Sequence, residues 1–194
     1  MAGEFGIELP EASPEARQKA RERRDKEDLY LQQAKACYEA MSRHSCIRQW
    51  WEARGFGQEL RGRFWLGTNK DGTAAVIPFW HRGRVQGLIR RKLAGKPRYI
   101  LPNAEEFPDG YKPLFIPGPI KEEIFLVEGY IDALAVAASG RSAIAVGGTE
   151  ISDAQREELR KVLPDGATIY ILPDGDERGA VAAREWGAEF LPHC

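Results

Sequence analysis

The stretch Ile124-Phe-Leu-Val-Glu-Gly-Tyr-Ile-Asp-Ala-Leu134 decides the fold class of this chain. Its first four residues are all apolar, and Glu128-Gly129 separates them from a segment with helical composition that runs to Gly140. A short apolar run bounded by a turn signal is typical of a strand buried on both faces. We therefore predict a strand at 124–127 and a helix at 130–139.

The same alternation continues toward the carboxyl terminus. Apolar runs predict strands at 142–146 and 168–172, and helices are expected at 153–163 and 179–187. Ser152 with Gln155 three residues later has the spacing of a helix capping box. A fourth strand is expected at 188–191. Buried strands alternating with helices predict an α/β fold whose parallel sheet is covered on both faces.

Acidic residues follow two of these predicted strands directly. Glu128 follows the first strand, and Asp174 and Asp176 follow the third. The carboxyl ends of parallel strands meet at one edge of the sheet, where ligands bind. Carboxylates gathered there repel one another unless a cation is present, and Mg²⁺ prefers such oxygen ligands. An Asp-Gly-Asp sequence on its own is also typical of a tight turn. The metal site is indicated instead by the joint placement of Glu128, Asp174 and Asp176 at one edge. Asp132, one helical turn beyond Glu128, is expected to join them.

The preceding part of the chain has the opposite charge. Residues 43–98 contain 13 Lys and Arg against 3 Asp and Glu, whereas residues 119–194 contain 7 against 14. A basic segment of this kind suits a polyanion, although two differently charged solvated surfaces would give the same count. Helices are expected at 13–41 and 45–54, and short β-type runs at 64–66, 74–80, 84–92 and 98–101 predict a small antiparallel unit.

Composition excludes several classes of protein. The sequence of 194 residues is 43% hydrophobic and 29% charged and has no apolar run near the roughly 18 residues that span a bilayer. Its start lacks the pattern of a secretory signal. Three cysteines, Cys37, Cys46 and Cys194, favour reduced thiols and a cytoplasmic setting. No Cys or His spacing suits zinc.

Three motifs, in this order, resemble the Toprim domain of primases and topoisomerases: Val127-Glu-Gly-Tyr-Ile-Asp-Ala-Leu134, Gly147-Gly-Thr149 and Asp174-Gly-Asp-Glu-Arg-Gly179. The first motif is most similar to that of DnaG-type bacterial and phage primases. Upstream, Trp50-Trp-Glu-Ala-Arg-Gly55, Gly83-Arg-Val-Gln-Gly-Leu-Ile-Arg-Arg91 and Pro97-Arg-Tyr99 resemble the primase core and its basic signature strands.

The resemblance implies a catalytic core that synthesises short RNA primers on single-stranded DNA from ribonucleoside triphosphates. It implies that Glu128, Asp174 and Asp176 are catalytic and bind Mg²⁺ or Mn²⁺, with Asp132 as a supporting ligand. It also implies a template and nucleotide path along the basic strands, formed by Arg84, Arg90, Arg91, Lys92, Lys96, Arg98 and Tyr99.

The expected organisation has three parts. Residues 1–28 are expected to be a vector-derived remnant and a charged linker or helix, residues 29–118 a basic α+β subdomain, and residues 119–194 a Toprim α/β subdomain that looks truncated. The family's zinc-binding domain and its contacts with a replicative helicase would then belong to a longer protein.

Two other functions remain open on the sequence alone. One is a Toprim nuclease, although such nucleases generally lack the basic signature at 83–99. The other is a non-catalytic module that binds single-stranded nucleic acid or associates with a helicase. Among single residues, Phe64, Trp65, Phe79 and Trp80 are expected in the core, and His81 is expected to be a solvated loop residue.

Overall fold

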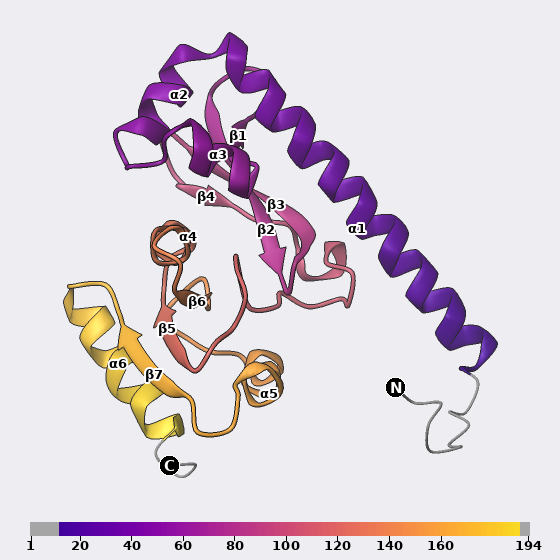
Figure 1. Ribbon diagram of the computed structural model, residues 1–194, viewed down its shortest axis with the longest axis vertical. Helices are drawn as coiled ribbons and strands as arrows, with labels where there is room; N and C mark the ends of the chain where they lie inside the picture. Colours follow the sequence, from indigo (N-terminus) through magenta and orange to yellow (C-terminus); the bar gives the residue numbers. More distant parts are fainter. Residues whose placement is uncertain (1–11, 191–194) are drawn as a thin grey trace.

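The computed structural model describes residues 12–190, which form two β-sheets with helices around them (Figure 1). The amino-terminal half holds the antiparallel sheet, with the order β1-β2-β3-β4, and the carboxyl-terminal half holds the parallel sheet, with the order β6-β5-β7. The α/β fold class is confirmed. The predicted vector remnant lies outside the described residues.

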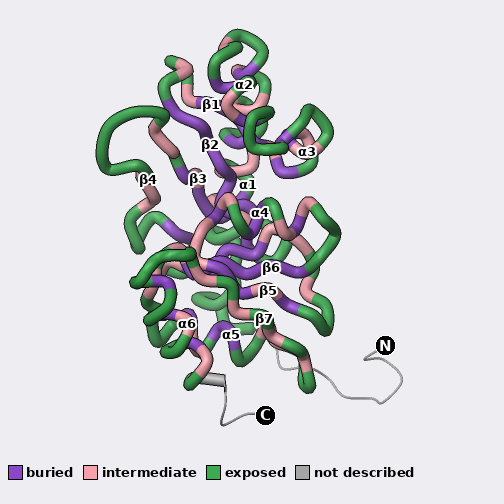
Figure 2. Tube along the Cα trace, turned by 90° about the vertical axis from the view of Figure 1, so that its left-hand side faces the viewer, coloured by how far each residue is buried: buried purple, intermediate pink, exposed green. Residues whose placement is uncertain are grey.

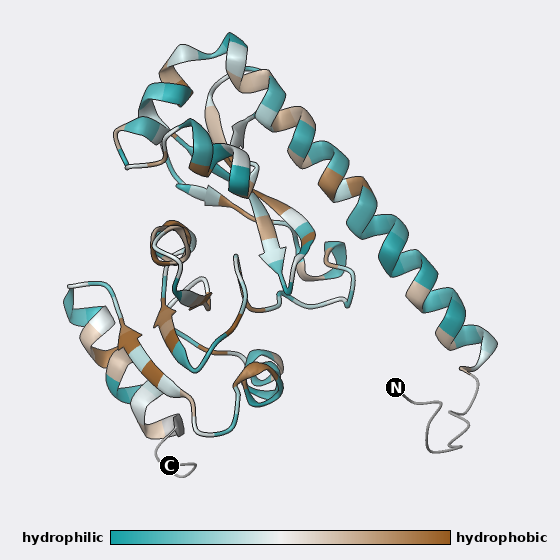
Figure 3. Cartoon of the chain, in the orientation of Figure 1, coloured by the Kyte–Doolittle hydropathy of each residue, from teal (hydrophilic) through white to brown (hydrophobic). Residues whose placement is uncertain are grey.

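A long helix, α1 (Pro14–Ala40), runs along the antiparallel sheet (Figure 1). The Ser13 side chain caps its start by accepting a hydrogen bond from the Ala16 amide at 3.2 Å. Most of its first half is hydrophilic (Figure 3). This half is nevertheless attached to the body, because Lys26 Nζ donates to the carbonyls of Glu105 and Phe107 at 3.0 and 3.2 Å.

The antiparallel sheet follows the predicted β runs with one exception. Its strands are β1 (Gly67–Thr68), β2 (Ala74–His81), β3 (Arg84–Lys92) and β4 (Tyr99–Ile100). Arg82 and Gly83, which join β2 to β3, both have positive φ, as in the tight turns that suit hairpins. The helices packed beside this sheet are α2 (Ser45–Glu52) and α3 (Gln58–Phe64), with short 3₁₀ turns at Met41–Arg43 and Ala104–Glu106.

The exception is the strand predicted at 64–66, which is wrong. Phe64 is the last residue of α3, and Trp65 adopts the left-handed conformation that ends the helix. Phe64 is buried against the core, so the apolar side chain that suggested a strand is one of the buried positions of a short helix.

The parallel half alternates strand and helix as predicted. Its strands are β5 (Glu123–Val127), β6 (Ser142–Ala145) and β7 (Thr168–Leu172), and its helices are α4 (Tyr130–Ala138), α5 (Asp153–Val162) and α6 (Glu177–Phe190). Residues of α4 pack on one face of the sheet, and residues of α5 and α6 pack on the other.

The fourth strand predicted at 188–191 is wrong over its described residues, because α6 continues through Phe190. Ala182 and Trp186, one helical turn apart, are both buried against the sheet. That spacing is helical, and it keeps the segment in the helix that precedes it.

One aromatic cluster joins the two halves. Phe79 of β2 makes edge-to-face contacts with Phe107, Phe115 and Tyr130, with ring centroids 4.9, 5.5 and 5.9 Å apart. Phe115 also exchanges two backbone hydrogen bonds of 2.9 Å with Ala145 of β6. The buried strands of both halves therefore meet in one interior (Figure 2).

His81 is buried in this junction, which contradicts the solvated position expected for it. Only 5% of the residue is exposed. Its Nδ1 lies 2.9 Å from the Leu114 carbonyl oxygen, and its Nε2 lies 2.9 Å from Glu158 Oε1 on α5. The other predicted core aromatics are confirmed only in part, since Phe64 and Phe79 are buried whereas Trp65 and Trp80 are half-buried.

Candidate functional site

Sheet topology brings the predicted carboxylates to one edge. Strands β5 and β7 are parallel neighbours, with Val127 paired to Leu172, so Glu128 and Asp174 leave the sheet side by side. The Asp174 amide donates a hydrogen bond of 3.3 Å to Glu128 Oε1. Asp176 follows two residues later, and its Oδ1 accepts a 2.8 Å bond from the Gly179 amide at the start of α6.

Several carboxylates lie at this edge, with few positive charges near them. Burial is the largest influence raising the pKa of Glu128, and the charges of Asp174 and Asp176 raise it further. The Asp174 amide and the Arg178 guanidinium act in the opposite direction. The pKa of Asp132, one turn into α4, is also raised, first by burial and then by Asp174. These carboxylates therefore act on one another.

The loop after β6 forms the adjacent part of the edge. The Gly147 amide donates to the Glu128 carbonyl oxygen at 3.0 Å. Gly147 has a φ of 75°, and a Cβ on it would lie 2.1 Å from the Tyr130 hydroxyl, so only glycine fits there. Lys112 Nζ donates to the Gly147 carbonyl at 3.4 Å, and burial lowers the pKa of this ammonium.

The donor set fits a hard divalent cation in chemistry. Carboxylate oxygens are the ligands that Mg²⁺ and Mn²⁺ prefer, and at this edge burial, followed by neighbouring carboxylates, raises the pKa of both Glu128 and Asp132. As the side chains are placed, however, no group of three His, Cys, Asp or Glu within residues 12–190 is arranged to hold a metal ion. Glu128, Asp174 and Asp176, with Asp132 beside them, are the residues that would hold one.

A cluster of aromatic rings and arginines lies on the other side of the site. The Arg54 and Arg91 guanidinium carbons lie 3.8 and 4.7 Å from the Trp50 ring centroid. Arg91 Nε also donates to the Tyr99 hydroxyl at 3.3 Å. Burial and the nearby Arg91 lower the pKa of Arg54. We refer to Trp50, Arg54, Arg91 and Tyr99 as the stacked cluster.

The stacked cluster is connected to the acidic edge through one ring contact. Tyr99 packs edge-to-face on Tyr130, with centroids 5.9 Å apart, and Tyr130 lies two residues after Glu128. The Tyr130 hydroxyl is buried without a hydrogen-bond partner, and burial followed by Tyr99 raises its pKa. The stacked cluster of one half thus contacts the helix that begins beside Glu128 in the other half.

Sequence reasoning missed Trp50 and Arg54 as members of this cluster. Their spacing of four residues is a usable signal, because side chains four apart in a helix lie on one face. Arg54 lies two residues beyond the end of α2, and its guanidinium Nη1 donates to the Trp50 carbonyl at 3.1 Å, which holds the side chain beside the Trp50 ring.

The other predicted basic residues do not gather around Arg91. Side chains alternate along a strand, so Arg90 and Lys92, the two neighbours of Arg91, point to the opposite face of β3. The pairing of β2 with β3 shifts register between Pro78 and Trp80, so this alternation does not extend to Arg84, whose Nε lies 3.9 Å from Glu27 Oε2 of α1. Lys96 and Arg98 are exposed in the connection between β3 and β4.

Part of the chain is similar in sequence to known proteins. Residues 125–191 match the family model described as Toprim-like. The DNA primase of Pseudomonas putida is 34% identical over 112 residues, which cover 53% of this chain and 16% of that relative. The chain therefore spans only about a sixth of the length of this relative.

Two solved structures share the fold. The RNA polymerase domain of Mycobacterium tuberculosis primase DnaG superposes with a TM-score of 0.63 at 18% identity, covering 84% of this chain and 70% of that one. The primase fragment of the bacteriophage T7 primase-helicase protein gives 0.53 at 18% identity, covering 71% and 58%. Residues 125–191 therefore match a Toprim-like domain, part of the chain is similar in sequence to DNA primases, and the fold is similar to that of the two primase structures.

Proposed function

We propose that this chain is the catalytic core of a DNA primase, which extends short RNA primers on single-stranded DNA by nucleotidyl transfer from ribonucleoside triphosphates. The proposal is carried by two groups that we take as one polymerase face: the Asp174 amide donates to Glu128 Oε1 at 3.3 Å, and the stacked cluster contacts this edge through the rings of Tyr99 and Tyr130. Similarity to named primases supports it.

Each side of the face has a chemical task in this reaction. A divalent cation held by Glu128, Asp174 and Asp176 would neutralise the triphosphate and stabilise the developing charge on the leaving pyrophosphate. Arg54 and Arg91 carry positive charge over an indole face, a combination that binds a phosphate backbone and stacks with bases irrespective of sequence. The remaining basic residues at 84–98 would extend this electrostatic path.

The test is incorporation of labelled ribonucleotides on single-stranded DNA, with Mg²⁺ or Mn²⁺ and with EDTA as control. We expect metal-dependent, template-dependent products, and a loss of at least about a hundredfold in Glu128→Gln and Asp174→Asn. Asp165→Asn is the matched control, because Asp165 is an exposed carboxylate in the turn before β7. Full activity in both site variants would refute the metal assignment.

A second candidate is a module that binds single-stranded nucleic acid without catalysis. It is favoured by the absence, within residues 12–190, of three donors arranged to hold a metal. Tight binding of single-stranded DNA that neither EDTA nor Glu128→Gln alters, together with no product, would support this candidate over the polymerase.

Whether the polypeptide associates with a replicative helicase or a zinc-binding domain is part of the same proposal. The structural neighbour from bacteriophage T7 is named a primase-helicase protein.

In the part of the chain that the structure describes, no helix is long and apolar enough to cross a membrane.

A further inference from the structure

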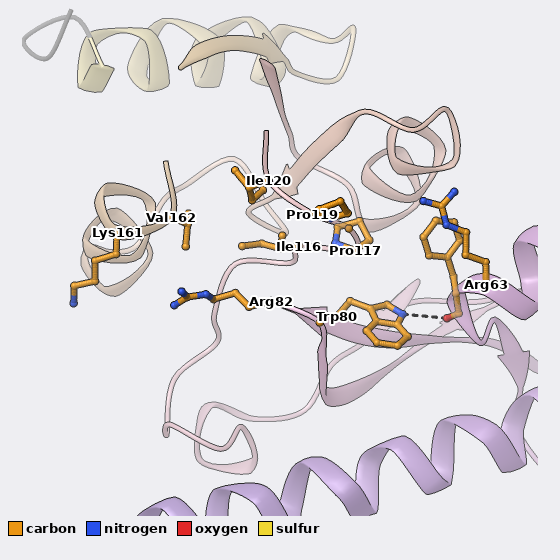
Figure 4. Close-up of a pocket in the computed structure, with 12 residues that line it drawn as sticks. Arg63, Trp80, Arg82, Ile116, Pro117, Pro119, Ile120, Lys161 and Val162 are labelled. Atoms are coloured by element: carbon orange, nitrogen blue, oxygen red, sulfur yellow. Dashed lines mark hydrogen bonds between the residues drawn. The ribbon is translucent and has the colours of Figure 1, made fainter. Parts of the chain in front are cut away.

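A pocket of about 580 Å³ lies at the junction of the two halves, away from the acidic edge. It is lined by the end of α3, the β2–β3 turn, the segment at 116–120 and the end of α5 (Figure 4). Lys121, next to this segment, donates from its amide to Ser142 Oγ, at the start of β6. The pocket thus borders the amino ends of the parallel strands. The carboxylates follow the carboxyl ends, about 15 Å further along a five-residue strand.

The interior of the pocket is apolar and its margins are cationic. Side chains of Trp80, Ile116, Ile120 and Val162 supply apolar surface, with two prolines between them. Arg63, Arg82 and Lys161 supply positive charge, and among residues 12–190 no carboxylate lines the pocket. In Figure 4, Arg63 lies at one end of the apolar strip, and Arg82 and Lys161 lie toward the other.

The three cations form no ion pair within residues 12–190, whereas Arg160 next to Lys161 is paired with Glu157. Three carboxylates line an adjacent pocket that shares Arg82 and Lys161, but each already has another partner: Asp109 has Arg23, Glu157 has Arg160 and Glu158 has His81. The Trp80 indole N–H is satisfied by the Phe64 carbonyl at 3.1 Å. The unpaired polar groups of the pocket are therefore its three cations.

We propose that this pocket binds a short acidic peptide segment of a partner protein, with an apolar side chain seated between flanking carboxylates. Charge complementarity selects the carboxylates, since arginine and lysine form charge-assisted hydrogen bonds with them. The volume is in the range of sites that accept a few side chains. This site is separate from the proposed polymerase face and does not depend on it.

The lining argues for a peptide rather than nucleic acid. Binding of single strands relies on exposed aromatic faces for successive bases, whereas this strip offers aliphatic side chains, prolines, one half-buried indole and the buried Phe64 ring. The adjoining parallel half carries twice as many acidic as basic residues, which opposes a long polyanion but tolerates a few carboxylates.

The test is selection from a random peptide display library on the immobilised full chain, followed by fluorescence anisotropy with the synthesised, labelled peptides. We expect enriched sequences that combine Asp or Glu with a large apolar residue. Their affinity should fall at least about tenfold in the Arg82→Gln/Lys161→Gln variant. The charge-matched control is Lys70→Gln/Arg184→Gln, which alters two exposed cations outside the pocket and should bind like the wild type.

Three outcomes would overturn the proposal. Enriched peptides could lack the acidic and apolar combination, or they could bind both double variants equally well. A labelled oligothymidylate could instead lose binding in the pocket variant while no acidic peptide is enriched, which would assign the pocket to nucleic acid. Circular dichroism of the variants checks their folding, and primer synthesis is not a readout, so failure here is distinct from failure of the proposed function.

Discussion

The two halves of the molecule assemble charged groups in different ways. In the parallel half, backbone topology brings Glu128 and Asp174 together, because each residue directly follows one of two paired strands. In the antiparallel half, side-chain stacking brings Arg54 and Arg91 together on the Trp50 ring. The backbone thus determines the acidic edge, whereas individual aromatic contacts determine the basic cluster.

This difference affects how each side responds to substitution. An acidic residue at a strand end keeps its place as long as the sheet is intact, so its replacement changes charge with little rearrangement. The basic cluster depends on Trp50 and Tyr99, so replacing a ring displaces the cations as well as removing a stacking surface. Substitutions at the junction of the halves, at the stacked cluster and at the acidic edge should therefore have effects of different size and kind.

The largest effect is expected at the cluster that joins the halves. Phe79→Ala removes a fully buried ring with contacts to Phe107, Phe115 and Tyr130, and it should lower the free energy of unfolding by about 3–5 kcal/mol. Urea denaturation followed by circular dichroism measures this loss. Both halves should still unfold in one transition, because the same ring packs in both.

Leu29→Ala is the control, because Leu29 is 51% exposed on α1 and its truncation should change stability by less than about 0.5 kcal/mol. Two separate transitions in the wild-type protein, of which Phe79→Ala shifts only one, would show instead that the halves fold independently.

The sequence predicted the acidic edge better than the stacked cluster, because the order of strands and helices is visible in the sequence whereas side-chain stacking is not. Alternating apolar strands and helices imply a parallel sheet, and a parallel sheet places every strand end at one edge, so Glu128, Asp174 and Asp176 needed no knowledge of side-chain packing. Which face of β3 carries Arg91 depends on where α1 packs, and local sequence does not determine that.

The buried His81 shows the same limit. Beside the turn at Arg82-Gly83 it has the sequence context of a solvated residue, whereas in the fold Leu114 and Glu158, both distant in sequence, supply partners for its two ring nitrogens. Phe64 and the end of α6 differ from prediction because short apolar runs fit a strand and a buried helical turn equally well.

An intermediate effect is expected from arginines on opposite faces of β3. Arg91→Ala should weaken binding of single-stranded DNA by about tenfold, because the variant loses both a phosphate contact and a group stacked on Trp50. Arg90→Ala, on the face of β3 opposite to Arg91, should weaken binding by about threefold or less. Fluorescence anisotropy across a salt series measures both affinities.

The salt series also separates charge from stacking. Arg91→Ala should reduce the slope of log affinity against log salt by about 0.7, the value for one phosphate contact on a single strand. Trp50→Leu should weaken binding even at high salt, where stacking dominates, and should also reduce the slope, because loss of the ring displaces Arg54 and Arg91. Equal losses in Arg91→Ala and Arg90→Ala would contradict the expectation that single-stranded DNA binds only at the face of β3 that carries Arg91.

The smallest effect is expected on the stability of the metal-free protein, where the carboxylates of the acidic edge lie together without a cation. The pKa of Glu128 is raised in the folded protein, so folding favours its protonated form, and this contribution to stability is lost as pH rises through the folded pKa. At neutral pH the ionised side chain therefore destabilises the metal-free protein. Glu128→Gln should raise the thermal midpoint by about 1–3 °C in EDTA at neutral pH, and by less near pH 4, where the wild-type carboxyl is largely protonated.

Thermal denaturation with and without Mg²⁺ distinguishes this electrostatic effect from a change in packing. A divalent cation at the acidic edge should stabilise the wild type more than Glu128→Gln, because the variant lacks one of the ligands that would hold it. Asp165→Asn should behave like the wild type in both conditions, since Asp165 is exposed and distant from the edge. A lower midpoint for Glu128→Gln in EDTA at neutral pH would mean that the charged carboxylate stabilises the fold through its bond from the Asp174 amide. The acidic edge would then be a structural feature of the turn after β7, and its topology would no longer argue for a metal site.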